Sequence, residues 1–300
     1  MCGIFLFSHT TPLTRLMTPT LAIAMEQRGD NSWGVTDGEF IFKRKGSIID
    51  TFQDCDLDGP VYHTRMATVG VNSDRNAHPF RFEGKNIVTG VHNGHIANYV
   101  ALKEKYKDRS AFEVDSEHIF AHLAEGKPVA ELSGSATVVW YEQPADKSVP
   151  MRRYMSRFNS ENMHVAKMKS GEIVMASTKD AIIIASQLAG GHIAHFYDTE
   201  AKRRYWIEPD PEKPGHMGLY QDMLLPWAEH PVVWSTPSTP THGHSYGGFR
   251  GRGGLHSITG DSCPSRMCAD GKLKTDEVIC AHCFSELRKD IFGDQSSATV

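Results

Sequence analysis

The 300-residue chain lacks the features that would assign it to a membrane, secreted or nucleic-acid-binding class. No apolar run approaches the ~20 residues of a membrane span, and no basic region followed by a cleavable apolar stretch opens the sequence. The formal net charge is only -4, so overall charge gives no reason to expect nucleic acid or an anionic membrane as the main partner. We therefore expect a cytoplasmic protein with no membrane partner, while a local basic patch leaves nucleic acid undecided.

Cysteine is also scarce in the body of the chain. Of the six cysteines, four lie together between residues 263 and 283, and the other two are Cys2 and Cys55. This distribution is typical of a reducing compartment with a metal site and not of a disulfide framework. With 300 residues, 40% of them hydrophobic and 23% charged, the chain is long enough for one large domain or two small ones and can bury a core of useful size.

Hydrophobic periodicity predicts a mixed α and β domain over the first two thirds of the chain. Helices are expected over residues 13–27, 98–106, 116–125 and 179–188, with Asp115 as the N-cap of the third. Strands are expected over 4–7, 33–36, 39–43, 61–66, 86–92, 136–141, 151–156, 164–168 and 172–176. Asp37-Gly38 predicts a hairpin turn between the second and third strands. Strands grouped at both ends with helices between them favour a layered fold over a regular βαβ alternation.

The composition changes after Trp206, which predicts four segments. A folded domain is expected over residues 2–207. Residues 208–260 are rich in Pro, Gly, Ser, Thr and His, so we expect an irregular extension packed on the first domain and then a flexible linker. A small metal-binding module is predicted over 261–292 and a disordered tail over 293–300. Arg250 and Arg252 could touch nucleic acid, but a plain linker is the simpler interpretation.

The first residues, Met1-Cys2-Gly3, suggest a nucleophile at the N-terminus. Removal of Met1 would leave Cys2 with a thiol and a free α-amine, whose pKa of about 7.7–8.0 leaves it partly unprotonated near neutrality. Such an amine can take the thiol proton directly or through one water, and the thiolate can then attack an acyl group. On its own, Cys2 would more simply be a small apolar residue that opens a strand, so the assignment depends on motifs downstream.

Several downstream segments complete a pattern with Cys2-Gly3-Ile4. They are Arg28-Gly29-Asp30-Asn31-Ser32, His63-Thr64-Arg65-Met66-Ala67-Thr68-Val69-Gly70, Asn76-Ala77-His78-Pro79, His92-Asn93-Gly94 and Asp115-Ser116-Glu117. Their order and spacing resemble the class II glutamine amidotransferases, an N-terminal-nucleophile family, and most closely the glutaminase domain of hexosamine-phosphate synthase. The resemblance covers residues 2–117. It implies an α+β fold, a four-layer αββα sandwich, and an enzyme that hydrolyses glutamine to glutamate and ammonia.

The resemblance assigns the catalytic roles to Cys2, Asn93 and Gly94. Attack by Cys2 on the side-chain amide of glutamine develops negative charge on the former carbonyl oxygen, and donors must already point there. Asn93 offers its side-chain amide and Gly94 its backbone N–H, although Asn-Gly alone would be read as a hairpin turn. Arg28 is expected to support the chain near the Cys2 amine, and a helix-terminal arginine stabilised by the helix dipole is an equal alternative.

The same resemblance places the substrate-binding residues. Arg65 supplies a planar fork for the α-carboxylate of glutamine, Asp115 a counter-charge for the α-ammonium, and Thr68 a hydroxyl contact. In isolation, Arg65 and Asp115 would more often be solvated surface residues. Met66 and Val69 stand where the family type has Trp and His, which predicts a changed glutamine pocket and not a changed reaction.

No sugar-isomerase, phosphoribosyltransferase or synthetase motif is found in the last third of the sequence. We therefore expect the ammonia to pass to a separate synthase subunit. Two other functions stay open. The chain could cleave a different γ-glutamyl amide, or the scaffold could be a non-catalytic module that recruits partners.

The C-terminal cysteines follow the pattern Cys263-x4-Cys268-x11-Cys280-x2-Cys283. Two close pairs separated by a hairpin-length stretch match a tetrahedral structural Zn²⁺ site. Four thiolates leave no open position on the metal, so we expect structural zinc, without which so short a segment could scarcely fold.

Overall fold

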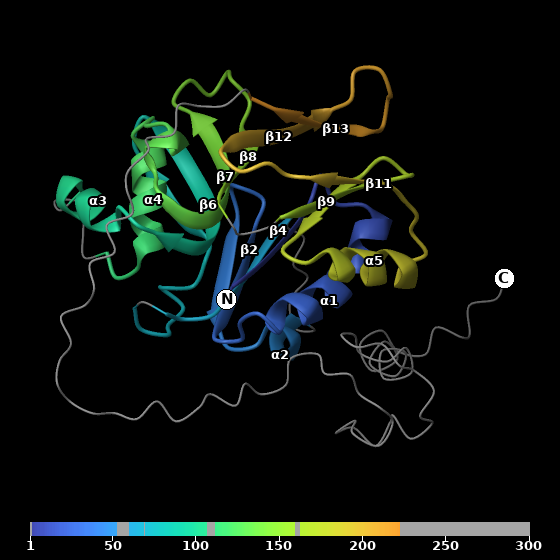
Figure 1. Ribbon diagram of the computed structural model, residues 1–300, viewed down its shortest axis with the longest axis horizontal. Helices are drawn as coiled ribbons and strands as arrows, with labels where there is room; N and C mark the ends of the chain where they lie inside the picture. The colour runs from blue at the N-terminus through green and yellow to red at the C-terminus, as the bar shows by residue number, and fades with distance from the viewer. Residues whose placement is uncertain (1, 53–59, 69, 107–111, 160–162, 223–300) are drawn as a thin grey trace. The chain divides into compact units, whose positions relative to one another are not determined.

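The computed structural model describes residues 2–52, 60–68, 70–106, 112–159 and 163–222 (Figure 1). All of these residues belong to one compact unit. Two antiparallel sheets form its centre. The predicted linker, zinc module and tail from residue 223 onward lie outside the described residues.

The first sheet has seven strands in the order β11-β9-β10-β1-β4-β2-β3. It is covered on its outer face by α1 (Pro12–Glu26), α2 (Ile48–Phe52) and α5 (Lys179–Leu188), which share a hydrophobic core with its strands (Figure 1). The strands are β1 (Gly3–Phe7), β2 (Ser32–Thr36), β3 (Ile41–Lys45), β4 (Val61–Arg65), β9 (His164–Met168), β10 (Ile173–Ala176) and β11 (Ile193–Asp198).

The second sheet has six strands in the order β13-β12-β8-β7-β6-β5. A second core joins it to α3 (Tyr99–Lys105) and α4 (Asp115–Ala124), and the 3₁₀ turn Val129–Glu131 follows α4. The strands are β5 (Phe80–Glu83), β6 (Asn86–Ile96), β7 (Gly134–Pro144), β8 (Arg152–Phe158), β12 (Arg203–Pro209) and β13 (Met217–Gln221).

A third core lies between the two sheets. It contains Ile4 and Leu6 of β1 together with Val91 of β6 and Val139 of β7. The described chain is therefore layered as helices, sheet, sheet and helices, and the predicted α+β class with two packed sheets is confirmed.

The alternation of side chains along β4 and β6 decides which residues face the space between the sheets. Val61 belongs to the inter-sheet core and Tyr62 to the core under the helices. His63 and Arg65 therefore share the inner face with Val61. By the same alternation, Asn93 shares the inner face of β6 with Val91, and His92 faces the helical layer.

Most predicted elements are present, and the hairpin at Asp37-Gly38 is confirmed by the pairing of Thr36 with Ile41. One helix start is wrong in the prediction. Asp115 was expected to cap α4, but it is the first helical residue and Val114 holds the N-cap position. The Glu117 carboxylate instead accepts hydrogen bonds from the backbone N–H groups of Glu113 and Val114.

The expectation of irregular chain after Ile207 also fails over one stretch. Met217–Gln221 forms β13, an edge strand that pairs with all but the first residues of β12. Tyr220 stacks near Trp206, with ring centroids 5.9 Å apart. The folded domain thus extends beyond residue 207, to at least Gln221.

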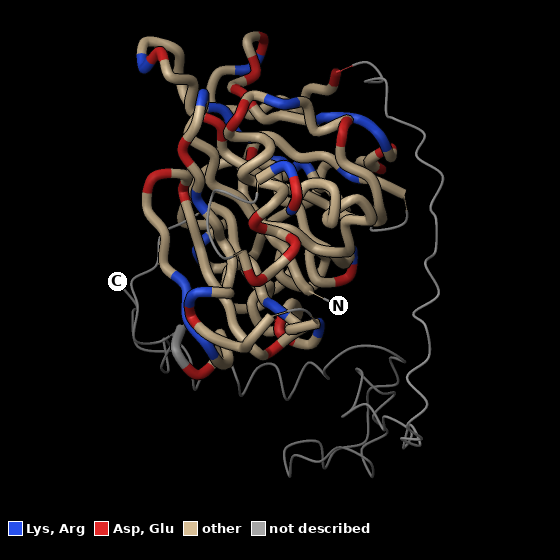
Figure 2. The backbone as a smooth tube through the Cα atoms, turned by 90° about the vertical axis from the view of Figure 1, so that its left-hand side faces the viewer, with Lys and Arg blue, Asp and Glu red and all other residues tan. Residues whose placement is uncertain are grey.

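The distribution of charged residues and the lengths of the helices are those of an ordinary globular domain. Figure 2 shows acidic and basic positions interspersed along the described chain. The longest described helix, α1, has 15 residues, which is short of the ~20 that a bilayer crossing requires.

Candidate active site

Cys2 lies directly before β1, beside the end of β4. Gly3 pairs with Thr64, which brings Cys2 next to the turn that follows Arg65. The Met66 N–H donates to Cys2 Sγ over 3.4 Å, and Cys2 Sγ lies 3.7 Å from the Met66 carbonyl oxygen. A Cβ on Gly3 would lie 2.6 Å from Thr64 Oγ1, so glycine is needed for this close approach.

The surroundings of the thiol disfavour its ionised form. Burial raises the pKa of the Cys2 thiol, and the nearby Asp115 carboxylate adds to the rise. The Met66 N–H and the Arg65 charge act in the opposite direction but do not cancel the effect of burial. A thiol in this position needs a base to become a nucleophile near neutral pH.

Arg65 and Asp115 come from different elements but lie in one electrostatic neighbourhood. Arg65 ends β4 and is 4% exposed, and its pKa is lowered by burial and raised by Cys2 and Asp115. Asp115 opens α4 and is partly exposed. The structure thus brings a cation and an anion to the neighbourhood of Cys2, as the predicted α-carboxylate and α-ammonium contacts require. Thr68 lies beyond the end of β4 and is exposed.

Asn93 and Gly94 do not form a hairpin turn, because both lie within the long strand β6. They pair with Thr137 and Ala136 of β7. Gly94 has a φ of +123°, and a Cβ there would lie 2.2 Å from the Ser135 carbonyl oxygen. Glycine is therefore required by both backbone conformation and space. Asn93 is 2% exposed, on the inner face of the strand.

Arg28 contacts the main chain of Cys2. Its Nε donates to the Cys2 carbonyl oxygen over 2.8 Å. α1 ends at Glu26, with Gln27 as its C-cap, so Arg28 lies outside the helix. This contact favours the support of Cys2 over a role at the helix dipole.

The Asn76-Ala77-His78-Pro79 segment is fixed between β3 and the start of α4. Asn76 is fully buried, and its amide donates to the Val71 carbonyl oxygen and to Glu113 Oε2. Lys43 Nζ donates to the Ala77 carbonyl oxygen over 3.0 Å. The motif thus connects β3 to the chain directly before α4, the helix that carries Asp115.

Two features of the site were missed in the sequence. The backbone of Met66 contacts the Cys2 sulfur, whereas the motif points only to the Met66 side chain. His63 and His92 join the elements that carry Arg65, Asn93 and Asp115, as detailed below. Their position in the same motifs, within two residues of Arg65 and Asn93, is the one signal that could have identified them.

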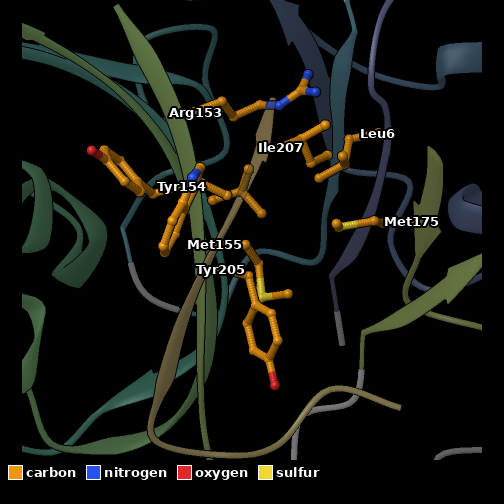
Figure 3. A pocket seen from close by; sticks show the side chains of 9 residues that line it. Leu6, Arg153, Tyr154, Met155, Met175, Tyr205 and Ile207 are labelled. Atoms are coloured by element: carbon orange, nitrogen blue, oxygen red, sulfur yellow. The ribbon is translucent and has the colours of Figure 1, made fainter. Parts of the chain in front are cut away.

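One pocket of the described chain is lined by none of the predicted site residues. It is located between the sheets, where side chains of both approach each other (Figure 3). Its lining is mostly apolar, and its one charged side chain, Arg153, donates to Tyr141 Oη over 3.1 Å and to the Ser8 carbonyl oxygen over 2.9 Å. The residues that line it are Leu6, Val139, Arg153, Tyr154, Met155, Met175, Tyr205, Trp206 and Ile207.

The predicted zinc ligands, Cys263, Cys268, Cys280 and Cys283, lie outside the described residues. Within the ranges that are described, no group of three or more His, Cys, Asp or Glu side chains is arranged to hold a metal ion.

Comparison with known proteins finds a related domain within this chain. A family model described as a glutamine amidotransferase domain matches residues 63–184. The glutamine-fructose-6-phosphate aminotransferases (isomerizing) of Staphylococcus aureus strain Mu50 and Methanosarcina mazei are each 37% identical, over 130 and 136 residues. The matches cover 40% and 41% of this chain and 21% of each relative. The chain therefore matches about a fifth of the length of these relatives.

Two solved structures share the fold. One is described as the allosteric regulatory enzyme of purine biosynthesis, with a TM-score of 0.54 and 19% identity. The other is glutamine phosphoribosylpyrophosphate amidotransferase from B. subtilis, with a TM-score of 0.52 and 18% identity. Each match covers 75% of this chain and 49% of the other. Motifs, fold and family match agree that this chain is similar to the glutamine amidotransferases, with residues 63–184 matching their glutamine amidotransferase domain.

Proposed function

We propose that this chain hydrolyses glutamine to glutamate and ammonia, with Cys2 of the mature chain as the nucleophile. The observation that carries the proposal is the place of Cys2. Its sulfur contacts the Met66 N–H directly after Arg65, and the charges of Arg65 and Asp115 both reach it. A nucleophile beside a cation and an anion suits a substrate that is itself an amino acid.

The raised pKa of the Cys2 thiol means that the reaction needs a base. A buried thiol keeps its proton near neutral pH, so a neighbouring group must accept it. The α-amine of Cys2 is within reach once Met1 is removed, and its ordinary pKa is about 7.7–8.0. Arg28 holds the carbonyl of the same residue and so limits how Cys2 can turn.

The reaction then follows acyl-transfer chemistry. The α-amine takes the thiol proton, and the sulfur attacks the side-chain amide carbon of glutamine. Negative charge on the former carbonyl oxygen is stabilised by the Asn93 amide and the Gly94 N–H. The C–N bond breaks as the leaving nitrogen takes the proton from the α-ammonium, and ammonia departs. Water then attacks the thioester, releasing glutamate and restoring the thiol.

Substrate binding is proposed to use the two charges near Cys2. Arg65 would hold the α-carboxylate through its planar fork, and Asp115 would hold the α-ammonium. Thr68 is exposed and would reach the substrate from the loop that follows β4. Met66 is 38% exposed and stands where the family type has an aromatic residue, so another γ-glutamyl amide is the second candidate substrate.

The ammonia is proposed to pass to a synthase partner that holds the acceptor. Two relatives are named as aminotransferases that use glutamine, and each is far longer than the match with this chain. We also propose that Cys263, Cys268, Cys280 and Cys283 hold one structural Zn²⁺, whose folding effect would be local to residues 261–292. Metal analysis of the full chain should find about one zinc per chain. A cytoplasmic setting would keep all of these thiols reduced.

Glutaminase assays of the purified full chain test the proposal. The parent should release ammonia and glutamate in equal amounts from glutamine, and Cys2→Ala should abolish turnover while keeping the fold. Full activity of Cys2→Ala would show that Cys2 is not the nucleophile. A parent that ignores glutamine but cleaves another γ-glutamyl amide would establish the second candidate.

A further inference from the structure

Two buried histidines lie next to proposed site residues but have no part in the chemistry above. His63 is in β4, two residues before Arg65, and His92 is in β6, directly before Asn93. His63 is fully buried and His92 is 3% exposed.

His63 joins the two sheets at the level of the site. Its Nε2 lies 3.0 Å from the carbonyl oxygen of His92. Because a carbonyl oxygen only accepts, Nε2 must carry the proton, which fixes the tautomer of His63. Burial lowers the pKa of His63 to about 3, so this donor is a neutral ring throughout the physiological range. β4 belongs to the first sheet and β6 to the second, so the bond crosses the inter-sheet layer.

His92 continues the connection to α4. Its Nδ1 lies 3.0 Å from Ser116 Oγ, and Ser116 is 2% exposed. Ser116 directly follows Asp115 in the first turn of α4. Burial lowers the pKa of His92 although Asp115 opposes this effect, so a neutral ring is again favoured. Two buried hydrogen bonds therefore link the three elements that carry Arg65, Asn93 and Asp115.

We propose that His63 and His92 are positioning residues for the oxyanion donors. The His92 carbonyl and the Asn93 nitrogen belong to one planar peptide unit, so holding the oxygen fixes the orientation in which the chain enters Asn93 and Gly94. Donors to an oxyanion are effective only if they are already in place, and a misplacement of about 1 Å can cost ~10²-fold in rate. The inference rests on the proposed hydrolysis of glutamine.

The role of these histidines is geometric and not acid–base. Both rings lose affinity for protons on burial, whereas a general acid or base near pH 7 needs a pKa close to that value. His78 packs against His63 with ring centroids 4.1 Å apart, and burial also lowers its pKa well below the ordinary value. His78 thus adds packing that holds the His63 ring in place.

Kinetics of four full-length proteins test this role. His63→Phe keeps a ring of similar size but removes the donor, and His63→Gln restores an N–H near the position of Nε2. The matched control is His122→Phe, since His122 is fully buried in α4 but bonds Tyr106 Oη and the Pro128 carbonyl oxygen, away from the proposed site residues. We expect His63→Phe to lower kcat for glutamine about tenfold or more with little change in KM. His63→Gln should recover most of the loss, and His122→Phe should keep the parent kcat.

The remaining kinetic outcomes would contradict either the positioning role of His63 or the proposed hydrolysis of glutamine. An unchanged kcat in His63→Phe, an equal loss in His122→Phe, or no recovery in His63→Gln would contradict the positioning role. A raised KM with a normal kcat would indicate that His63 contributes to substrate binding, which would also contradict the positioning role. If His63→Phe does not fold, Ser116→Ala is the second variant, because it removes the oxygen that bonds His92 Nδ1. Ser116→Ala should lower kcat several-fold. A parental kcat in this variant would overturn the proposal. A parent that releases no ammonia from glutamine overturns the proposed function instead.

Discussion

The guanidinium of Arg28 holds the main chain of Cys2, because its Nε donates to the Cys2 carbonyl oxygen over 2.8 Å. The two residues are 26 positions apart and are brought together by the return of α1 against β1. The main chain of the proposed nucleophile, Cys2, is thus held by a charged donor that lies outside β1.

Loss of this contact should slow turnover. Hydrogen bonds that involve a charged group contribute about 1.5–3 kcal/mol, and about 1.4 kcal/mol corresponds to a factor of ten in rate. We expect Arg28→Leu to lower kcat/KM for glutamine about tenfold. Arg15→Leu, on the exposed side of α1, is the control and should keep the parent value. Equal effects of the two substitutions would show that the Arg28 contact has no specific role.

Gly94 should not tolerate alanine. The substitution would place a Cβ 2.2 Å from the Ser135 carbonyl oxygen at a φ of +123°, so β6 and β7 would have to separate around the oxyanion donors. We expect kcat to fall at least ~10²-fold, as when one such donor is lost. Gly190→Ala is the control, since Gly190 also has a positive φ, of +71°, but no atom within 4 Å of the added Cβ. It should cost about 1 kcal/mol of stability and leave kcat unchanged. A Gly94→Ala protein with parental kcat would contradict the assignment of its N–H.

Loss of the proposed contacts with glutamine should raise the KM for glutamine. Arg65→Lys replaces a planar fork by a point charge, and Asp115→Asn removes the counter-charge for the α-ammonium, so each should raise KM for glutamine about tenfold. Arg152→Lys and Asp146→Asn, both on exposed positions, are the matched controls. Steady-state kinetics that give parental KM values for both Arg65→Lys and Asp115→Asn would show that the pocket is elsewhere.

The buried histidines should make the fold sensitive to acid. Burial lowers the pKa of His63 to about 3, while the unfolded chain keeps a value near 6.5. Between these values the unfolded state binds more protons, so stability is fully present above pH 6.5 and is lost as pH falls toward 3. The slope is at most about 1.4 kcal/mol per pH unit for each such histidine.

Urea unfolding at pH 7 and pH 5 measures this loss. The drop in the free energy of unfolding should be smaller in His63→Gln than in the parent, because one titrating ring is gone. An identical drop in both proteins would show that His63 is not neutral in the folded state or does not become charged on unfolding.

Elements defined by local patterns could be predicted from the sequence. The apolar spacing in residues 13–27 predicted α1, and Asp37-Gly38 predicted the β2–β3 hairpin. Asn93-Gly94 shows the limit of local signals. The pair favours a turn by itself, but pairing with β7 along all of β6 holds it in a strand. β13 was missed for the same reason, since Met217–Gln221 becomes a strand only by pairing with β12.

The sequence motifs predict which residues form the candidate site, but they do not predict the hydrogen bonds that hold these residues in place. The His63–His92 contact joins two strands of different sheets and exists only once the sheets have packed. The contact of Arg28 with Cys2 likewise depends on how α1 returns to β1. Motifs identify residue types at fixed spacing, whereas these contacts depend on tertiary packing.

The central claim is that Cys2 is the mature N-terminus and the nucleophile, and mass spectrometry of the full chain with a diazo analogue of glutamine tests it most directly. The chain has five other cysteines as internal controls. The account predicts an intact mass without Met1 and a single addition of the analogue, mapped by digestion to Cys2 and lost in Cys2→Ser. Active protein that retains Met1, or that is inactivated by modification at another residue, would contradict it.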